Sequence, residues 1–326
     1  MNNSGTRIIF MGTPEFATGT LKTLIDENYV IAGVVTAPDK PAGRGKKISE
    51  SAVKVFTREN IPESPILQPE KLKDPEFIAE LHSLNGDLFV VVAFRMLPEA
   101  VWSIPRLGTI NLHASLLPQY RGAAPINWCL VNGETETGVT TFLIDHEIDT
   151  GKILMQEKVG IHPEDNAGTL HDKLMHAGAD LVVKTVANLE KDDITPIKQD
   201  VISANDSDLK KAPKITREDC RINWNSNVDS INNLIRGMTP FPGAFSKLRD
   251  TDGKSLMVKI LKSAPASINS KKQPGSIESD NKTFLQVHTS NGVLDILTLQ
   301  LEGKKRMAIG DFLRGFNNDL NHLQFD

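Results

Sequence analysis

The sequence predicts an α/β protein in which an open, mostly parallel sheet with helices on both faces is followed by a smaller β-barrel domain. Two observations support this prediction. In the first part of the chain, apolar runs that suit buried strands alternate with helical patterns. After residue 211 this alternation stops, and short strand-like runs follow one another between Gly, Asp and Asn residues.

The first elements form a strand, helix, strand unit. RIIFMG is an apolar strand, and TPEFATGTLKTLIDEN is a helix for which we expect Thr13 as N-cap and Pro14 at the first position. YVIAGVVTA is the second strand. A helical connection of this kind usually joins parallel strands.

The alternation continues to about residue 191. SAVKVFTREN is helical, DLFVVVAF is apolar enough for a strand buried on both faces, and GTINLH is a further strand. APINWCLVNG is a helix entered at Pro125 and closed by Gly133. TGVTTFLID and KILMQEKVGI are strands close enough to pair, and TLHDKLMHAGADLVVKTVANLEKD is a long helix. Such a Rossmann-like sheet binds ligands at the carboxyl ends of its strands.

Residues 192–211 have little apolar periodicity and are predicted to be a linker between a catalytic domain, 1–191, and a barrel domain, 212–326. The barrel domain has one helical stretch, VDSINNLIRGM, and a turn, TPFPG. Its predicted strands are AFSKLRD, KSLMVKILKSA, TFLQVHTS and GVLDILTLQLEG. A barrel of the oligonucleotide-binding type (OB-like) fits this size, as other small β folds would.

Charge is unevenly distributed along the chain. From Lys210 to the end, 18 Lys and Arg residues oppose 12 Asp and Glu residues, whereas the first 209 residues have a net charge of -10. A basic second half suggests a polyanionic partner, although an ordinary solvated face would give the same count.

Two classes of protein are excluded by the composition. No run approaches the ~18 apolar residues of a membrane span, and MNNSGTRIIF lacks the apolar core of a secretory signal, so we expect a cytoplasmic protein without a membrane partner. Cys129 and Cys220 are too few for a disulfide framework and lack the spacing of a metal site. We expect two reduced, packed thiols.

Three polar residues are expected to meet at the carboxyl end of the sheet. Asn111 and His113 are two residues apart at the end of GTINLH, so their side chains share a face. Asp149 follows the next long strand. Because loops at adjacent strand ends converge, we expect one cluster.

Such a cluster suits acyl transfer to an amine. The Asn111 amide would donate to the oxyanion of a tetrahedral intermediate, and His113 would donate or shuttle a proton. Asp149 would orient the imidazole and favour its protonated form. On spacing alone, the alternative that Asn111 and Asp149 cap turns around a core histidine is equally good.

Motifs in collinear order over nearly the whole chain resemble the folate-dependent formyltransferases, in particular those that act on aminoacylated tRNA. These motifs are FMGTPEFA, APDKPAGRGKK, VKVFTRENIP, VVVAF, NLHASLLPQYRGAAPINW, IDTG, APKITREDCRINW and GKKRM. The resemblance implies the formyltransferase fold and transfer of the formyl group of 10-formyltetrahydrofolate to methionine esterified to initiator tRNA, for translation initiation. It also implies a monomer that needs no metal.

The resemblance also implies roles for individual residues. Asn111, His113 and Asp149 match the catalytic positions of the family. The expected folate-binding residues are Ser115, Leu116, Leu117, Pro118 and Phe94. The expected tRNA-binding residues are Arg44, Lys46, Lys47, Lys210, Lys211, Lys304, Lys305 and Arg306. Arg95 stands where many relatives have glycine, so the wall of the folate pocket there is expected to differ.

Three rival functions are weighed against this one. A nicotinamide dehydrogenase is disfavoured because FMGTPEFA has one glycine where a G-x-G-x-x-G turn is required. A formyltransferase acting on another amine, such as a purine-pathway enzyme, would share the three polar residues but would normally end near residue 200. An inactive RNA-binding relative would explain the positive charge of the second half but would give Asn111, His113 and Asp149 no catalytic role.

Overall fold

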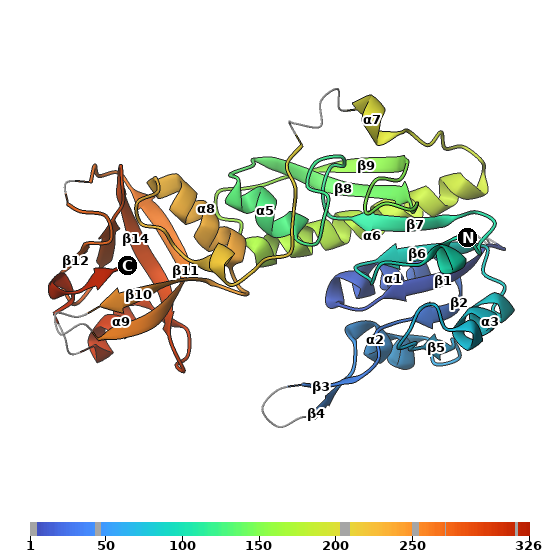
Figure 1. The fold of residues 1–326 in the computed structure, drawn as a ribbon, viewed down its shortest axis with the longest axis horizontal. Helices are drawn as coiled ribbons and strands as arrows, with labels where there is room; N and C mark the ends of the chain where they lie inside the picture. Colours follow the sequence, from blue (N-terminus) through green and yellow to red (C-terminus); the bar gives the residue numbers. More distant parts are fainter. Residues whose placement is uncertain (1–4, 43–46, 203–208, 250–253, 271, 317–318) are drawn as a thin grey trace. The chain divides into compact units, whose positions relative to one another are not determined.

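The structure is a computed structural model of the chain, and it describes all residues except 1–4, 43–46, 203–208, 250–253, 271 and 317–318 (Figure 1). The chain forms two compact units. The sheet unit comprises residues 1–122, 136–160 and 171–211, and the barrel unit comprises residues 123–135, 161–170 and 212–326. The barrel unit therefore takes two segments from the first part of the chain. The boundaries expected from sequence, at 192 and 211, stay a prediction.

The predicted open, mostly parallel sheet is confirmed. Its strand order is β5-β2-β1-β6-β7-β8-β9. The first five strands in this order are parallel, whereas β8 is antiparallel to β7 and β9 is antiparallel to β8. The strands are β1 (Arg7–Gly12), β2 (Val30–Val35), β5 (Ile66–Leu67), β6 (Leu88–Val92), β7 (Thr109–His113), β8 (Glu136–Leu143) and β9 (Ile153–Gly160). A separate two-stranded hairpin consists of β3 (Lys40–Ala42) and β4 (Lys47–Ser49).

Helices of the sheet unit bury the apolar faces of the central strands. Ile9 and Met11 of β1 share one buried cluster with Phe77 and Val101, which lie on α3 and α4. The helices of the unit are α1 (Glu15–Asp26), α2 (Ala52–Asn60), α3 (Pro75–Ser83), α4 (Glu99–Trp102), α6 (Ala167–Glu190), whose first turn belongs to the barrel unit, and α7 (Gln199–Ile202). No described helix is long and apolar enough to cross a membrane.

The start of α1 differs from the prediction. The helix begins at Glu15, and Pro14 rather than Thr13 occupies the N-cap position. Pro14 has an extended backbone, with φ -83° and ψ 177°, so the helical turn starts one residue later than the proline signal suggests. The N-cap of α2 is Ser51, whose hydroxyl accepts a hydrogen bond from Lys54 N.

The barrel unit is a nearly closed antiparallel barrel, which confirms the second half of the fold prediction. Its strand order is β12-β13-β14-β11-β10-β16, and a bridge between Ser276 and Gln324 joins the two ends of this path. The strands are β10 (Ala244–Arg249), β11 (Ser255–Ala266), β12 (Ile277–Ser279), β13 (Leu285–His288), β14 (Val293–Leu301), β15 (Met307–Ala308) and β16 (Gln324–Phe325). Its helices are α5 (Pro125–Val131), α8 (Val228–Met238) and α9 (Ile309–Gly315).

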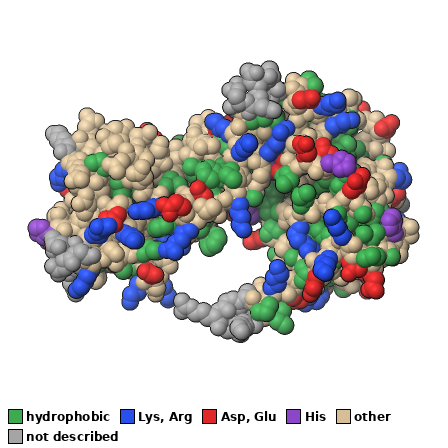
Figure 2. All heavy atoms as spheres, viewed as in Figure 1, with side chains coloured by type: hydrophobic (Ala, Val, Ile, Leu, Met, Phe, Trp, Pro, Cys, Tyr) green, Lys and Arg blue, Asp and Glu red, His purple; other side chains and the backbone are tan. Residues whose placement is uncertain are grey.

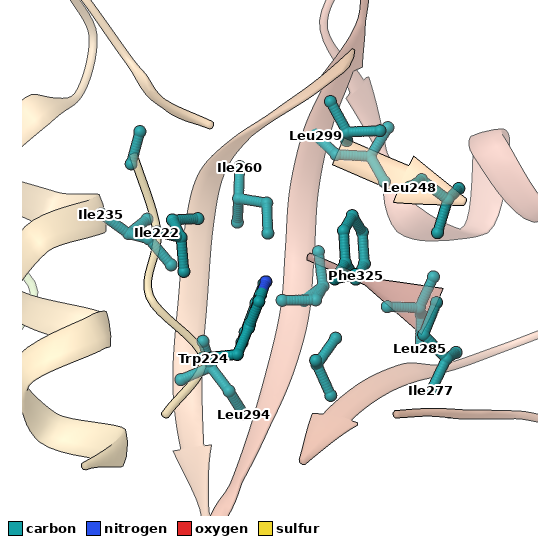
Figure 3. Close-up of a cluster of buried hydrophobic side chains, with 14 of the residues drawn as sticks. Ile222, Trp224, Ile235, Leu248, Ile260, Ile277, Leu285, Leu294, Leu299 and Phe325 are labelled. Carbon is teal, nitrogen blue, oxygen red and sulfur yellow. The ribbon is translucent and has the colours of Figure 1, made fainter. Parts of the chain in front are cut away.

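The barrel encloses a core of aromatic and branched side chains (Figure 3). The rings of Trp224 and Phe325 lie 5.3 Å apart between their centroids. The buried indole N–H of Trp224 donates to Ser246 Oγ over 3.0 Å, so the polar atom of this large side chain is satisfied. Ile260 of β11 is fully buried in the same core.

Ile260→Ala is expected to lower the free energy of unfolding of the barrel unit by about 2 to 5 kcal/mol, because truncation removes buried methyl groups and leaves a cavity. Urea denaturation followed by circular dichroism measures the change. Ile268→Ala is the matched control, since Ile268 is 52% exposed in the same unit. Equal losses in the two variants would contradict the assignment of Ile260 to the core.

Candidate active site

Asn111 and His113 lie on β7, the last of the parallel strands and the neighbour of the antiparallel strand β8. They are two residues apart in the strand, so both side chains project from the same face, as the sequence predicts. On the β8 side, Asn111 pairs with Phe142 and His113 pairs with Thr140. His113 is 7% exposed, and Asn111 is partly exposed.

Asp149 lies beside His113. Its Oδ2 atom is 3.9 Å from His113 Nδ1, and the same oxygen accepts a hydrogen bond from Gly122 N over 2.9 Å. Asp149 has φ 57°, in the left-handed region that Asp tolerates better than most residues. The structure therefore brings the predicted histidine and aspartate together.

The path by which Asp149 arrives differs from the sequence argument. Because β8 runs antiparallel to β7, its last residue, Leu143, pairs with Ile110 and not with the carboxyl end of β7. The loop after β8 must run back along β7 to reach His113. Gly151 allows the return, since a Cβ atom there would lie 1.7 Å from Leu143 O. The expectation that the carboxyl ends of β7 and β8 meet at one edge of the sheet is therefore wrong, but Asp149 does lie close to His113.

Both nitrogens of the His113 ring face hydrogen-bond acceptors. Nε2 is 2.9 Å from the carbonyl oxygen of Tyr120, and Nδ1 faces the Asp149 carboxylate. A neutral imidazole has one N–H and can donate to only one of them, whereas the protonated ring has two. Of the two contacts, the one from Nε2 to Tyr120 O is within hydrogen-bonding distance, whereas the Asp149 carboxylate faces Nδ1 over 3.9 Å.

The side-chain amide of Asn111 forms no hydrogen bond with any other residue that the structure describes. It sits within a strand, so it caps no turn. An amide N–H that is held by a rigid strand and left without a protein acceptor suits an oxyanion in the substrate. This observation weighs against the turn-capping alternative for Asn111.

The loop after β7 carries most of the predicted folate residues. The Ser115 hydroxyl donates to Gln119 O over 2.6 Å, and the Thr140 hydroxyl donates to Ser115 O over 2.6 Å and accepts from Leu117 N. Gln156 Nε2 donates to Leu117 O over 2.8 Å. Thr140 and Gln156, which the sequence argument missed, therefore fix this loop from β8 and β9.

Burial separates the five predicted folate residues into two groups. Ser115, Leu117 and Pro118 are buried, whereas Leu116 and Phe94 are partly exposed. Only the second pair presents side-chain surface to a ligand in this structure. The assignment of all five residues to folate stays a prediction.

Arg95 supports the segment next to Phe94. Its guanidinium donates to Pro69 O over 2.8 Å and to Glu70 O over 3.1 Å, and it lies 5.3 Å from the centroid of the Phe94 ring. Burial lowers the pKa of this guanidinium from its usual value. Arg95 thus connects the end of β6 to the chain after β5.

Gln199 is a site residue that the sequence argument missed. It lies within the predicted linker and is 3% exposed. Its Nε2 donates to Asp149 O over 2.9 Å and to Gly151 O over 2.8 Å, while its Oε1 accepts from Arg121 Nε and NH2. A single polar side chain in a segment without periodicity gives no sequence signal, yet it holds the backbone on both sides of Thr150.

Gln199→Ala is expected to lower kcat by about 10- to 100-fold, because small misplacements of a reacting group are costly to catalysis. Steady-state kinetics with both substrates measures the change. Asn60→Ala in α2 of the same unit removes an exposed amide hydrogen bond and serves as control. A normal kcat in folded Gln199→Ala would show that the Asp149 loop needs no such support.

The predicted tRNA-binding cations fall into three groups. Arg44 and Lys46 lie outside the described residues, and the backbone of Lys47 belongs to β4. Lys210 and Lys211 are exposed, and their backbone is tied to the loop after β7, since Tyr120 N donates to Lys210 O over 2.7 Å. The third group is exposed between β14 and β15 and comprises Lys304, Lys305 and Arg306.

The barrel unit is less basic than the sequence count after Lys210 suggests. Residues 212–326 carry 16 Lys and Arg and 12 Asp and Glu, and the two earlier segments of the unit add three further acids. Figure 2 shows Lys and Arg side chains interspersed with Asp and Glu on the visible face. Any RNA contact by this unit must therefore come from local groups of cations. In the described part of the chain, no cluster of His, Cys, Asp or Glu is arranged to hold a metal ion.

Comparison with known proteins identifies relatives over the full length. The formyl transferase family model matches residues 6–186, and the model of the formyl transferase C-terminal domain matches residues 214–317. Methionyl-tRNA formyltransferase of Bacteroides fragilis is 49% identical over 97% of this chain and 97% of its own. That of Azobacteroides pseudotrichonymphae genomovar. CFP2 is 50% identical with the same coverage.

Solved structures share the fold at lower identity. HypX from Aquifex aeolicus, in complex with tetrahydrofolic acid, has a TM-score of 0.62 at 18% identity, over 97% of this chain and 49% of that chain. WlaRD, a sugar 3N-formyl transferase, has a TM-score of 0.61 at 20% identity, over 93% of this chain and all of its own.

Proposed function

We propose that this chain, which belongs to the methionyl-tRNA formyltransferases of the formyl transferase family, transfers a formyl group from 10-formyltetrahydrofolate to the amino group of methionine on initiator tRNA. The product, formylmethionyl-tRNA, serves translation initiation, which occurs in the cytoplasm. The donor and the aminoacylated tRNA are two substrates that meet at the carboxyl end of β7. The reaction requires no metal.

The single observation that carries this proposal is the arrangement of Asn111, His113 and Asp149. The free amine of methionine attacks the formyl carbon, and the carbonyl oxygen becomes an oxyanion. The Asn111 amide, which has no hydrogen bond to another described residue, donates a hydrogen bond to that oxygen. The His113 ring, which faces the Asp149 carboxylate, carries the proton lost by the amine to the folate nitrogen, whose bond to the formyl carbon breaks.

The identity of the formyl acceptor is inferred from the names of the relatives and from the Lys residues near the site. The curated relatives with about half of their residues in common are named for methionyl-tRNA. Lys210 and Lys211 are exposed where the backbone joins the loop after β7, a location suited to the phosphates of an acceptor end. The folate is proposed to contact Leu116 and Phe94 by their exposed surfaces.

A comparison of formyl acceptors in separate reactions tests the proposal. The protein is incubated with 10-formyltetrahydrofolate and, in parallel, with methionyl initiator tRNA, methionyl elongator tRNA, free methionine or a dTDP-linked amino sugar. We expect formyl transfer to methionyl initiator tRNA at the highest kcat/KM. Preference for the amino sugar would assign the chain another amine substrate, and tRNA binding without transfer would make it an inactive relative.

A further inference from the structure

The described side chains of the β3–β4 hairpin in the sheet unit contribute little packing. Its described side chains at Lys40, Pro41, Ile48 and Ser49 are all exposed, and Ile48 is 73% exposed. None of these residues belongs to a buried cluster. A two-stranded hairpin without a buried face is marginal by itself. We therefore expect contacts at the base of the hairpin to determine its orientation.

The base of the hairpin is held by one lysine. Asp39 precedes β3 and Glu50 follows β4, so these two acids mark the two ends of the hairpin. Lys54 Nζ on α2 lies 2.5 Å from Asp39 Oδ2 and 3.2 Å from Glu50 Oε1. Its ammonium group therefore joins both ends of the hairpin to the same helix.

Neighbouring groups complete this ionic cluster. Arg58 NH1 and NH2 donate to the two carboxylate oxygens of Glu50 over 2.9 and 3.1 Å. Gln68 Nε2 donates to Asp39 Oδ1 over 2.8 Å. Every carboxylate in the cluster thus has a partner besides Lys54, but only Lys54 contacts both.

The side chains of this cluster are partly buried, so the electrostatic interactions between their charges are less weakened by solvent. The side chains of Lys54, Asp39 and Glu50 are 19%, 27% and 29% exposed, whereas the Lys22–Asp26 pair on α1 is 62% and 57% exposed. The hydrogen bond from Lys54 lowers the pKa of Asp39, and that from Arg58 lowers the pKa of Glu50. Sheltered pairs are less screened by salt than exposed ones.

We propose that Lys54 is a positioning residue for tRNA, which fixes the direction of the β3–β4 hairpin by clamping both of its ends to α2. This inference rests on the proposed function, because Arg44, Lys46 and Lys47, between the start of β3 and the end of β4, are expected to bind tRNA. Without the ammonium group, Asp39 and Glu50 face each other as like charges and the base of the hairpin loosens. The active site on β7 is built without any member of this cluster.

The variant Lys54→Met, which keeps the length of the side chain and removes its charge, tests the inference. The KM for methionyl-tRNA is expected to rise about tenfold, because a misdirected binding element loses contacts, while kcat and the KM for the formyl donor change less than about twofold. Lys54→Arg should recover most of the loss. Lys22→Met, which breaks the exposed pair on α1, is the matched control and should leave all constants unchanged.

A second variant keeps the test decisive if Lys54→Met does not fold. Asp39→Asn leaves Lys54 with Glu50 and should raise the KM for tRNA by about threefold, since one of two anchors remains. Equal changes in both KM values, or a fall in kcat alone, would mean that the cluster is structural and would overturn the inference.

A loop variant separates this inference from the proposed function. Arg44→Ala is expected to raise the KM for tRNA, and the double variant with Lys54→Met should be little worse than Arg44→Ala alone if both act through the hairpin. If the wild-type protein formylates methionyl-tRNA but Lys54→Met leaves its KM unchanged, the inference fails and the function stands. If the wild-type protein transfers no formyl group to tRNA, the proposed function itself fails.

Discussion

Asn111→Ala is expected to lower kcat by about 10² to 10³, the size of effect that follows loss of one oxyanion donor, with little change in folate affinity. The amide of Asn111 has no hydrogen bond to another described residue, so its removal breaks no hydrogen bond that the structure shows. Steady-state kinetics and folate titration measure the two effects separately.

Asn188→Ala on α6 provides the control for this substitution, because it removes an amide whose described contact is with Met155 Sδ, away from β7. Its kcat should equal that of the wild type. Near-normal turnover in folded Asn111→Ala would contradict the role of this residue as an oxyanion donor.

Asp149→Asn should lower kcat by about 10² to 10⁴, a range typical for loss of support to a proton-transferring group. The amide oxygen can still accept from Gly122 N, so the loop should keep its position. The negative charge that faces His113 Nδ1 over 3.9 Å is lost.

Glu147→Gln is the matched control for Asp149→Asn, because it makes the same change of charge in the same loop at an exposed position. It should leave kcat unchanged. A similar fall in both variants would show that the loop responds to net charge and that Asp149 has no special relation to His113.

The period of two in GTINLH was enough to place Asn111 and His113 on one face, because alternation in a strand is a local property. The direction of β8 was not predictable in the same way. The 22 residues between β7 and β8 contain α5, which made the connection resemble a parallel crossover. In the structure α5 belongs to the barrel unit, where Asn127 Nδ2 donates to Gly237 O of α8 over 2.7 Å.

The contacts of Gln199 and of Lys54 at the base of the β3–β4 hairpin were not predictable from a single sequence. Both depend on contacts between residues far apart in the chain, such as Gln199 with Asp149 and Lys54 with Asp39. Neither contact produces periodicity or a motif. The short helix α3 is a different case, because Asp74 and Pro75 form an N-cap signal in the sequence, whereas the apolar spacing alone does not indicate a helix there.

The most direct test of the central claim is a single-turnover measurement with a carbon-labelled formyl donor. Excess protein is mixed with labelled 10-formyltetrahydrofolate and methionyl initiator tRNA, and the label on the methionine amino group is followed by mass spectrometry. We expect rapid transfer by the wild type and a rate constant lower by about 10² to 10³ for Asn111→Ala. The same rate constant in both proteins, or no label on methionine, would contradict the assignment of this site to formyl transfer.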